Sequence, residues 1–439
     1  MSSRTSCVAS RRSPAWWESS ASDGEVVVVR PALRPVEIIR VPNGQGSLVT
    51  VLRDPEAIAP HAVEVRAPLD AALGLFDGRR ETAEIGKLLR GRGIRVTDSE
   101  VERLALDLEE AAYLVGPTAR ARKAAIARAY AAAPVREATH AGGAYHGDPQ
   151  ALARFVETSC LGRAGGAKLD GEIVGLVAPH MDLWRAAVGY GHAYAALRDR
   201  MPKQLETVVV LGTCHAGLRS AFCMTRKGFA TPLGELGVDG QMADELAAGA
   251  AEDVYEEELK HKGEHSIEFQ CVFLRHLLGE ERAARVRIVP ILCGLGRPQV
   301  ERRDPARDRL ASRFLGTLGE ALARRAGRVL VVAGADLAHV GPRFGDAAPL
   351  DEAGRHALER RDRASLDLAV ALEAAPFFDH VTEDLYERRV CGIGPLYTLL
   401  RSMDALGAQR GRLLSYEQNV DPEEGSIVSH ASVAYVGKA

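Results

Sequence analysis

The sequence predicts an α/β protein in which helices flank a mostly parallel sheet, with a small α+β domain before it. Three observations support this prediction. Apolar runs without polar alternation recur after residue 151, as in strands that are buried on both faces. Amphipathic helical segments separate these runs, which is the order that builds a parallel sheet. The first part of the chain differs, because short strands are followed there by short helices.

Length and composition limit the class of protein. At 439 residues the chain favours two domains. A formal net charge of -3 gives no support for a nucleic-acid partner, and no apolar run approaches the ~20 residues that span a bilayer. The seven cysteines contain no CxxC pair, which argues against a disulfide scaffold. We therefore expect a cytoplasmic protein without a membrane or nucleic-acid partner, and the sequence leaves its oligomeric state open.

The first 150 residues are expected to form three parts. Residues 1–24, rich in Ser and Arg, predict a disordered leader. Residues 25–118 predict a winged-helix-like domain, whose acidic third helix favours a protein-contact or regulatory role over DNA binding. Residues 119–150 predict a helix followed by a linker. The expected strands of the domain are 25–30, 36–39, 48–52 and 113–115, with a hairpin turn at 43–46 and helices at 69–76, 82–89 and 97–110.

Residues 151–439 predict the larger α/β domain. Its expected strands are 173–178, 207–211, 287–292 and 329–333. Its expected helices are 186–198, 240–248, 266–278, 306–324 and 395–406.

Three of the expected strands end in a histidine. His180 follows the first strand, His215 the second, and His339 lies shortly after the fourth. Ligands of open α/β sheets bind outside the carboxyl ends of the strands. One such histidine is unremarkable, since a loop histidine is readily hydrated, but three in one domain predict a shared polar site.

Two aspartates accompany these histidines. Asp182 could ligate a metal, could orient the imidazole of His180, or could cap a helix. Asp336 stands three residues before His339, a spacing at which it could hold one imidazole tautomer while the ring acts as acid or base. The alternative for Asp336 is a capping role.

Two further residues stand at helix starts. His265, between Glu264 and Ser266, opens an amphipathic helix and could reach the pocket or belong to a cap; the segment is not HExxH. Cys391 precedes a helix that begins near Pro395, where the helix dipole would favour a thiolate, although a cysteine can also be a small buried apolar residue. The sequence holds no GxGxxG after a strand, no P-loop and no GxSxG elbow.

Together these segments resemble the Memo family, whose bacterial and archaeal members are often called AmmeMemoRadiSam system protein B. The resemblance spans about residues 171–436 and does not cover residues 1–150. It rests on Pro179-His180, Leu211-Gly212 with His215, Thr231-Pro232-Leu233-Gly234, Val238-Asp239, Glu264-His265-Ser266-Ile267-Glu268, Val289-Pro290-Ile291-Leu292 with Gly294, Asp336 with His339, Cys391-Gly392, and Ser415-Tyr416 with Gln418.

The resemblance implies the fold of class III extradiol dioxygenases, with a metal pocket at one end of the sheet. It implies His180, His215 and Cys391 as metal ligands, and it places Asp336, His339 and His265 around them. A thiolate suits soft or covalent metal bonding. The chain departs from the family pattern at Asp182, where a carboxylate replaces a glycine beside the first ligand.

The sequence therefore predicts a Memo-like metal-binding protein, with Fe(II) as the expected metal and copper or zinc as alternatives. As an enzyme it would be a dioxygenase-like oxidoreductase, with His339, Asp336 and His265 as catalytic residues and a small-molecule or peptide substrate. The resemblance also suggests a radical-SAM partner. The rival interpretation is a peptide- or metal-binding module without catalysis. Zinc-assisted hydrolysis is a third interpretation, disfavoured because no base stands in a zincin arrangement.

Overall fold

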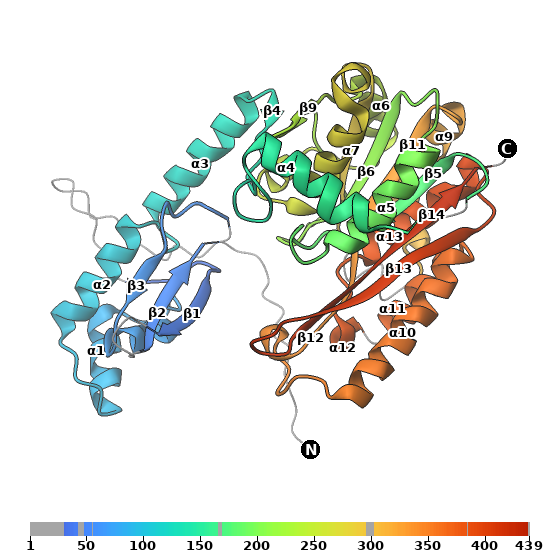
Figure 1. Cartoon of the computed structure of the whole chain (residues 1–439). Helices are drawn as coiled ribbons and strands as arrows, with labels where there is room; N and C mark the ends of the chain where they lie inside the picture. The colour runs from blue at the N-terminus through green and yellow to red at the C-terminus, as the bar shows by residue number, and fades with distance from the viewer. Residues whose placement is uncertain are drawn as a thin grey trace. The chain divides into compact units, whose positions relative to one another are not determined.

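The computed structural model describes residues 30–42, 48–54, 56–165, 169–295, 303–383 and 385–437. The chain divides into two compact units between Ala132 and Ala133, and each is described by itself (Figure 1). The expected leader, most of the expected strand at 25–30 and the hairpin turn at 43–46 lie outside the described residues.

The first unit holds a three-stranded antiparallel sheet of order β1-β2-β3, followed by helices. The helices expected at 82–89 and 97–110 are confirmed, and Thr97 and Glu100 form a reciprocal capping box at the start of the second. The expected strand at 113–115 is reduced to one bridge between Leu33 and Leu114. The elements are β1 Glu37–Pro42, β2 Leu48–Arg53, β3 Val63–Val65, a 3-10 helix Leu69–Leu75, α1 Thr82–Gly91, α2 Asp98–Glu110 and α3 Pro117–Ala132.

The second unit is built on an eight-stranded sheet of order β12-β14-β5-β11-β6-β10-β7, with β13 paired to β14. All four strands expected from the sequence are present in it. The strands are β5 Ile173–Ala178, β6 Thr207–Thr213, β7 Phe222–Met224, β10 Arg287–Cys293, β11 Val329–Gly334, β12 Asp336–Val340, β13 Gly411–Val420 and β14 Ile427–Val436.

The prediction of a mostly parallel sheet is correct only for the centre. β5, β11, β6 and β10 run parallel, whereas β7, β12, β13 and β14 pair antiparallel. The long β13–β14 pair was not predicted, because its strands are not apolar runs that alternate with helices. The observed architecture is a mixed sheet with a parallel core.

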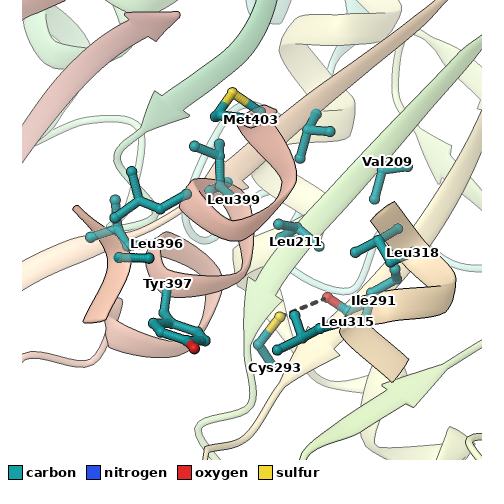
Figure 2. Packing of buried hydrophobic residues seen from close by; sticks show 14 of the residues in the cluster. Val209, Leu211, Ile291, Cys293, Leu315, Leu318, Leu396, Tyr397, Leu399 and Met403 are labelled. Atoms are coloured by element: carbon teal, nitrogen blue, oxygen red, sulfur yellow. Dashed lines mark hydrogen bonds between the residues drawn. The ribbon is translucent and has the colours of Figure 1, made fainter. Parts of the chain in front are cut away.

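Helices cover both faces of this sheet, because neighbouring residues of a buried strand point to opposite sides. Val208 and Val210 of β6 join the core beneath α5 and α7, whereas Val209 and Leu211 join the core beneath α9 and α13. Figure 2 shows part of the core beneath α9 and α13, to which Leu211 of β6 and Leu396 and Leu399 of α13 belong. The helices of this unit are α4 Pro149–Phe155, α5 Ala187–Arg200, α6 Gly240–Gly249, α7 His265–Ala283, α9 Arg309–Arg324, α10 Glu352–Val370, α11 Ala374–Thr382, α12 Leu385–Arg388 and α13 Ile393–Met403.

The segment expected as a linker is a structured part of the second unit. β4 (Val135–Arg136) pairs in parallel with β8 (Gly228–Thr231), which pairs with β9 (Gly234–Leu236). Tyr145 is fully buried in the core on the α5 and α7 side of the sheet. The glycines and polar residues of this segment suggested a linker, but its side chains bind α7.

Within the described residues, no helix is long and apolar enough to cross a membrane.

Candidate metal centre

The carboxyl ends of three neighbouring strands deliver most of the predicted site residues. His180 follows β5, His215 follows β6, and Asp336 and His339 lie on β12, directly after β11. β5, β11 and β6 are parallel neighbours, so their ends meet at one edge of the sheet. The structure thus brings together residues that lie up to 159 positions apart in the sequence.

Two glycines allow the first turn of α7 to approach this edge. A Cβ on Gly212 of β6 would lie 2.5 Å from Ser266 Oγ, and a Cβ on Gly334 of β11 would lie 2.5 Å from the Ser266 carbonyl. Ser266 Oγ in turn donates to the Thr213 carbonyl at 2.9 Å. This close approach carries His265 to the strand ends.

Three imidazoles form the centre of the site. One ring nitrogen from each of His180, His215 and His265 lies within 4.8 Å of the others, a spacing at which one metal ion can contact all three. The rings of His215 and His265 stack with centroids 4.6 Å apart, and His180 stands edge-on to both. The side chain of His180 is 2% exposed and that of His215 is 38% exposed, so the site is accessible from the His215 side.

Hydrogen bonds orient two of these rings, those of His180 and His215, so that Nε2 is left for a ligand. His180 Nδ1 lies 2.9 Å from the Gly334 carbonyl, and His215 Nδ1 lies 3.0 Å from Glu264 Oε1. A carbonyl or carboxylate oxygen can only accept, so each Nδ1 donates, and in the neutral ring Nε2 keeps its lone pair. This arrangement is typical of metal-binding histidines.

Burial and the charge of Glu264 set the protonation states of the histidines in the site. Burial lowers the pKa of His180, and it lowers the pKa of His265 to about 3, so both rings are neutral at pH 7. Burial also acts to lower the pKa of His215, but the hydrogen bond and charge of Glu264 outweigh it and raise that pKa. Glu264 itself is held ionised, since its bonds to His215 lower its pKa despite burial.

Cys391 lies beside this group, in the loop before α13. Its Sγ is 3.1 Å from His180 Nε2 and 4.0 Å from His339 Nε2. Burial, reinforced by the Asp336 charge, raises the pKa of the Cys391 thiol well above its usual value. The expected thiolate is therefore not favoured by the protein alone, because burial outweighs the helix dipole. A bound metal cation would favour the thiolate.

Asp336 and His339 are both in the site, but they do not form the expected pair. Asp336 Oδ1 accepts the backbone N–H of His180 at 2.9 Å. His339 Nδ1 instead lies 3.1 Å from the Leu337 carbonyl, which fixes its tautomer. The two residues lie on a strand with a register shift between them, so the helical spacing assumed from the sequence does not apply. Asp336 therefore orients the His180 loop rather than the His339 ring.

Asp182 interacts with a neighbouring arginine. Its Oδ2 accepts from Arg185 Nε at 2.6 Å, and its Oδ1 accepts from the Arg185 backbone N–H at 3.1 Å. The carboxylate is thus engaged in a turn before α5, whose N-cap residue is Ala186, and it does not belong to the three-imidazole group.

Three residues that shape the site were not predicted from the sequence. Glu264 was not predicted as a site residue, yet its carboxylate binds His215. Glu268 is fully buried and binds His140, which was assigned to a linker. The ring of His140 contacts that of His265, with centroids 5.6 Å apart. The spacing of Glu264 and Glu268 around His265 was visible in the sequence, but their partners, 49 and 128 positions away, were not.

Comparison with known proteins finds one family that matches most of the second unit. The family described as "Memo-like protein" matches residues 136–434. A MEMO1 family protein of Aquifex aeolicus is 27% identical over 391 residues, covering 88% of this chain and 95% of that protein, so the alignment extends beyond the second unit. MEMO1 family proteins of Methanopyrus kandleri (29% identical; 67% of this chain, 96% of that protein) and Thermococcus kodakarensis (31%; 69% and 99%) also match.

Among solved structures, an uncharacterized protein from Escherichia coli K12 aligns with a TM-score of 0.31 and 14% identity over 61% of this chain and 100% of that chain, a likeness too low to support an argument. The family match covers more than half of the sequence and includes every predicted ligand. The chain therefore belongs to the Memo-like protein family.

Proposed function

We propose that the second unit binds one transition-metal ion at the strand ends, with His180 and His215 as two of its ligands. The observation that carries this proposal is the three-imidazole group, in which ring nitrogens lie within 4.8 Å of one another and the Nδ1 atoms of His180 and His215 are held by acceptors. Such outer hydrogen bonds are expected for metal ligands.

The third ligand is proposed to be Cys391. Its Sγ lies 3.1 Å from His180 Nε2, and the resemblance to the Memo family assigns it this role. His265 is the competing third ligand, because its ring belongs to the geometric group. Imidazole and thiolate donors suit iron, copper and zinc, and the resemblance favours Fe(II).

For the reaction, we propose dioxygenase-like oxidoreductase chemistry on a small-molecule or peptide substrate. Fe(II) at this site would supply Lewis acidity and electron transfer toward dioxygen. His339, whose Nδ1 is held by the Leu337 carbonyl, has its Nε2 near Cys391 and would exchange a proton with bound substrate. Asp336 keeps the His180 loop in place, and the exposed side of His215 leaves a route for substrate.

Metal analysis after anaerobic purification tests the proposal. We expect near-stoichiometric iron in the unmutated protein and little in His215→Ala, with His356→Ala as the control, since His356 is an exposed histidine of α10. Absence of bound metal would refute the metal site. Bound iron without oxygen uptake on catechol-like or peptide substrates would leave the binding-module function in place of the enzyme.

A further inference from the structure

Residues 135–147, here called the strap, run across the start of α7 and are held there by Glu268. Four strap side chains bind this one carboxylate: Arg136, Thr139, His140 and Tyr145. Arg136 also donates from Nη2 to the Glu264 carbonyl at 2.8 Å and from Nε to the His261 carbonyl at 3.0 Å. The strap is thus fastened directly beneath the turn that carries His265.

Glu268 is ionised and acts only as an acceptor. Burial acts to raise its pKa, but the hydrogen bond from His140 and the charge of Arg136 lower it to about 2. Its Oε1 accepts the His140 backbone N–H at 3.0 Å, and its Oε2 lies 2.9 Å from His140 Nδ1. Glu268 therefore fixes both the backbone and the ring of His140.

This bond determines which atom of His140 is left for other partners. Since a carboxylate accepts, His140 Nδ1 donates to Glu268, and Nε2 carries the lone pair of the neutral ring. The ring stands edge-on to His265 and Phe269, with centroids 5.6 and 5.7 Å away. The side chain is 28% exposed, so its position combines a fixed orientation with access from solvent.

We propose that His140 is a binding residue of the pocket, whose Nε2 accepts a hydrogen bond from an N–H or O–H group of the molecule bound at the metal. This inference rests on the metal site proposed above. His140 contacts a pocket imidazole and lies outside the ligand group, so the donor it fits belongs to a part of the bound molecule other than its metal-binding atom. The ligand class is a metal-binding molecule with such a second polar group, and Glu268 is the positioning residue.

Imidazole and 1-methylimidazole make a matched pair of probes. Both bind a metal through one ring nitrogen, but only imidazole carries an N–H on the far side of the ring. Binding of each to Co(II)-loaded protein is followed by visible absorption. For each protein, the preference is the Kd for 1-methylimidazole divided by the Kd for imidazole. We expect this ratio to be about fivefold to tenfold higher in the unmutated protein than in His140→Phe, which corresponds to one hydrogen bond.

His140→Phe keeps an aromatic ring against His265 but lacks Nε2, and His356→Phe is the matched control. Metal content is measured first in every variant. If the unmutated protein holds no metal, the proposed function fails. If all variants hold metal and the preference for imidazole is the same in His140→Phe, the role of His140 is overturned. Loss of metal in His140→Phe also overturns the role of His140, since His140 would then support the metal site itself. Glu268→Gln should lose the preference for imidazole as well, because Glu268 positions His140.

Discussion

The carboxylate of Glu264 contacts His215 twice, through the backbone N–H at 2.9 Å and through ring Nδ1 at 3.0 Å. The same carboxylate accepts the Ser266 backbone N–H at 3.0 Å and caps α7. One buried group therefore fixes the direction of one pocket ring and the start of the helix that carries another.

Glu264→Gln should lower metal affinity by about 10- to 100-fold, the usual cost of losing an outer-shell partner. The amide keeps the size of the side chain but removes the negative charge and one acceptor oxygen. Competition with a chromophoric chelator measures the affinity. Glu281→Gln is the control, because the Glu281 side chain is 90% exposed. Equal affinity in both variants would show that Glu264 only caps the helix.

The third metal ligand can be identified by comparing Cys391→Ala with His265→Ala. We expect Cys391→Ala to lose bound metal and His265→Ala to retain most of it, because a thiolate is the stronger donor to a soft metal. Co(II)-loaded unmutated protein should show near-ultraviolet sulfur-to-metal absorption that disappears in Cys391→Ser. The opposite order of metal loss would assign His265 as the third ligand.

Gly212→Ala should move the first turn of α7. The added Cβ would lie 2.5 Å from Ser266 Oγ and 2.6 Å from Ile267 Cγ1, so we expect a loss of about 1–3 kcal/mol in the free energy of unfolding and a weaker metal site. Denaturant titration and chelator competition measure the two effects. Gly316→Ala in α9 is the control: nothing lies within 4 Å of its added Cβ, and helix propensity predicts a gain of about 0.5–1 kcal/mol.

Glu268→Gln should destabilise the protein by about 3–5 kcal/mol at pH 7, because Arg136 would remain buried without its counter-charge. The pKa of Glu268 is lowered from 4.5 to about 2, so its contribution is complete above pH 4.5 and is lost as the pH falls toward 2. Denaturant titrations across this range should show a smaller loss of stability in Glu268→Gln than in the unmutated protein. A parallel decline in both would contradict this assignment.

Two truncations should behave differently. A protein of residues 133–439 keeps the strap and should bind metal as the full chain does. A protein of residues 151–439 lacks Arg136, His140 and Tyr145, leaves the buried Glu268 without these partners, and should lose stability and metal. Thermal unfolding and metal content measure both effects. Equal thermal stability and equal metal content in the two truncated proteins would show that the strap is dispensable.

The central strands and their histidines could be predicted because their signals are local. An apolar run such as Val208–Leu211 has one stable environment, a strand covered on both faces, and a histidine directly after it must lie at the sheet edge. Neighbouring strand ends then converge wherever the strands are parallel. For this reason His180, His215 and His339 were found without knowledge of the fold.

The features of the site that could not be predicted depend on contacts between residues far apart in the sequence. Arg136 and Glu268 are 132 positions apart, and nothing in either local sequence indicates the other. The orientation of His339 depends on a register shift in β12, which no spacing rule anticipates. The state of the Cys391 thiol depends on how deeply the loop is buried, and burial outweighs the helix dipole that the sequence suggested.

The bond between Arg136 and Glu268 also has a consequence for folding. Closing a loop of 132 residues is entropically costly and slow compared with forming a local turn. During translation the strap is synthesised before β5, β6 and α7. Arg136 therefore has no Glu268 carboxylate to pair with until α7 has been synthesised. The pocket therefore matures late, and a mutation in the strap is expected to slow the appearance of metal-competent protein.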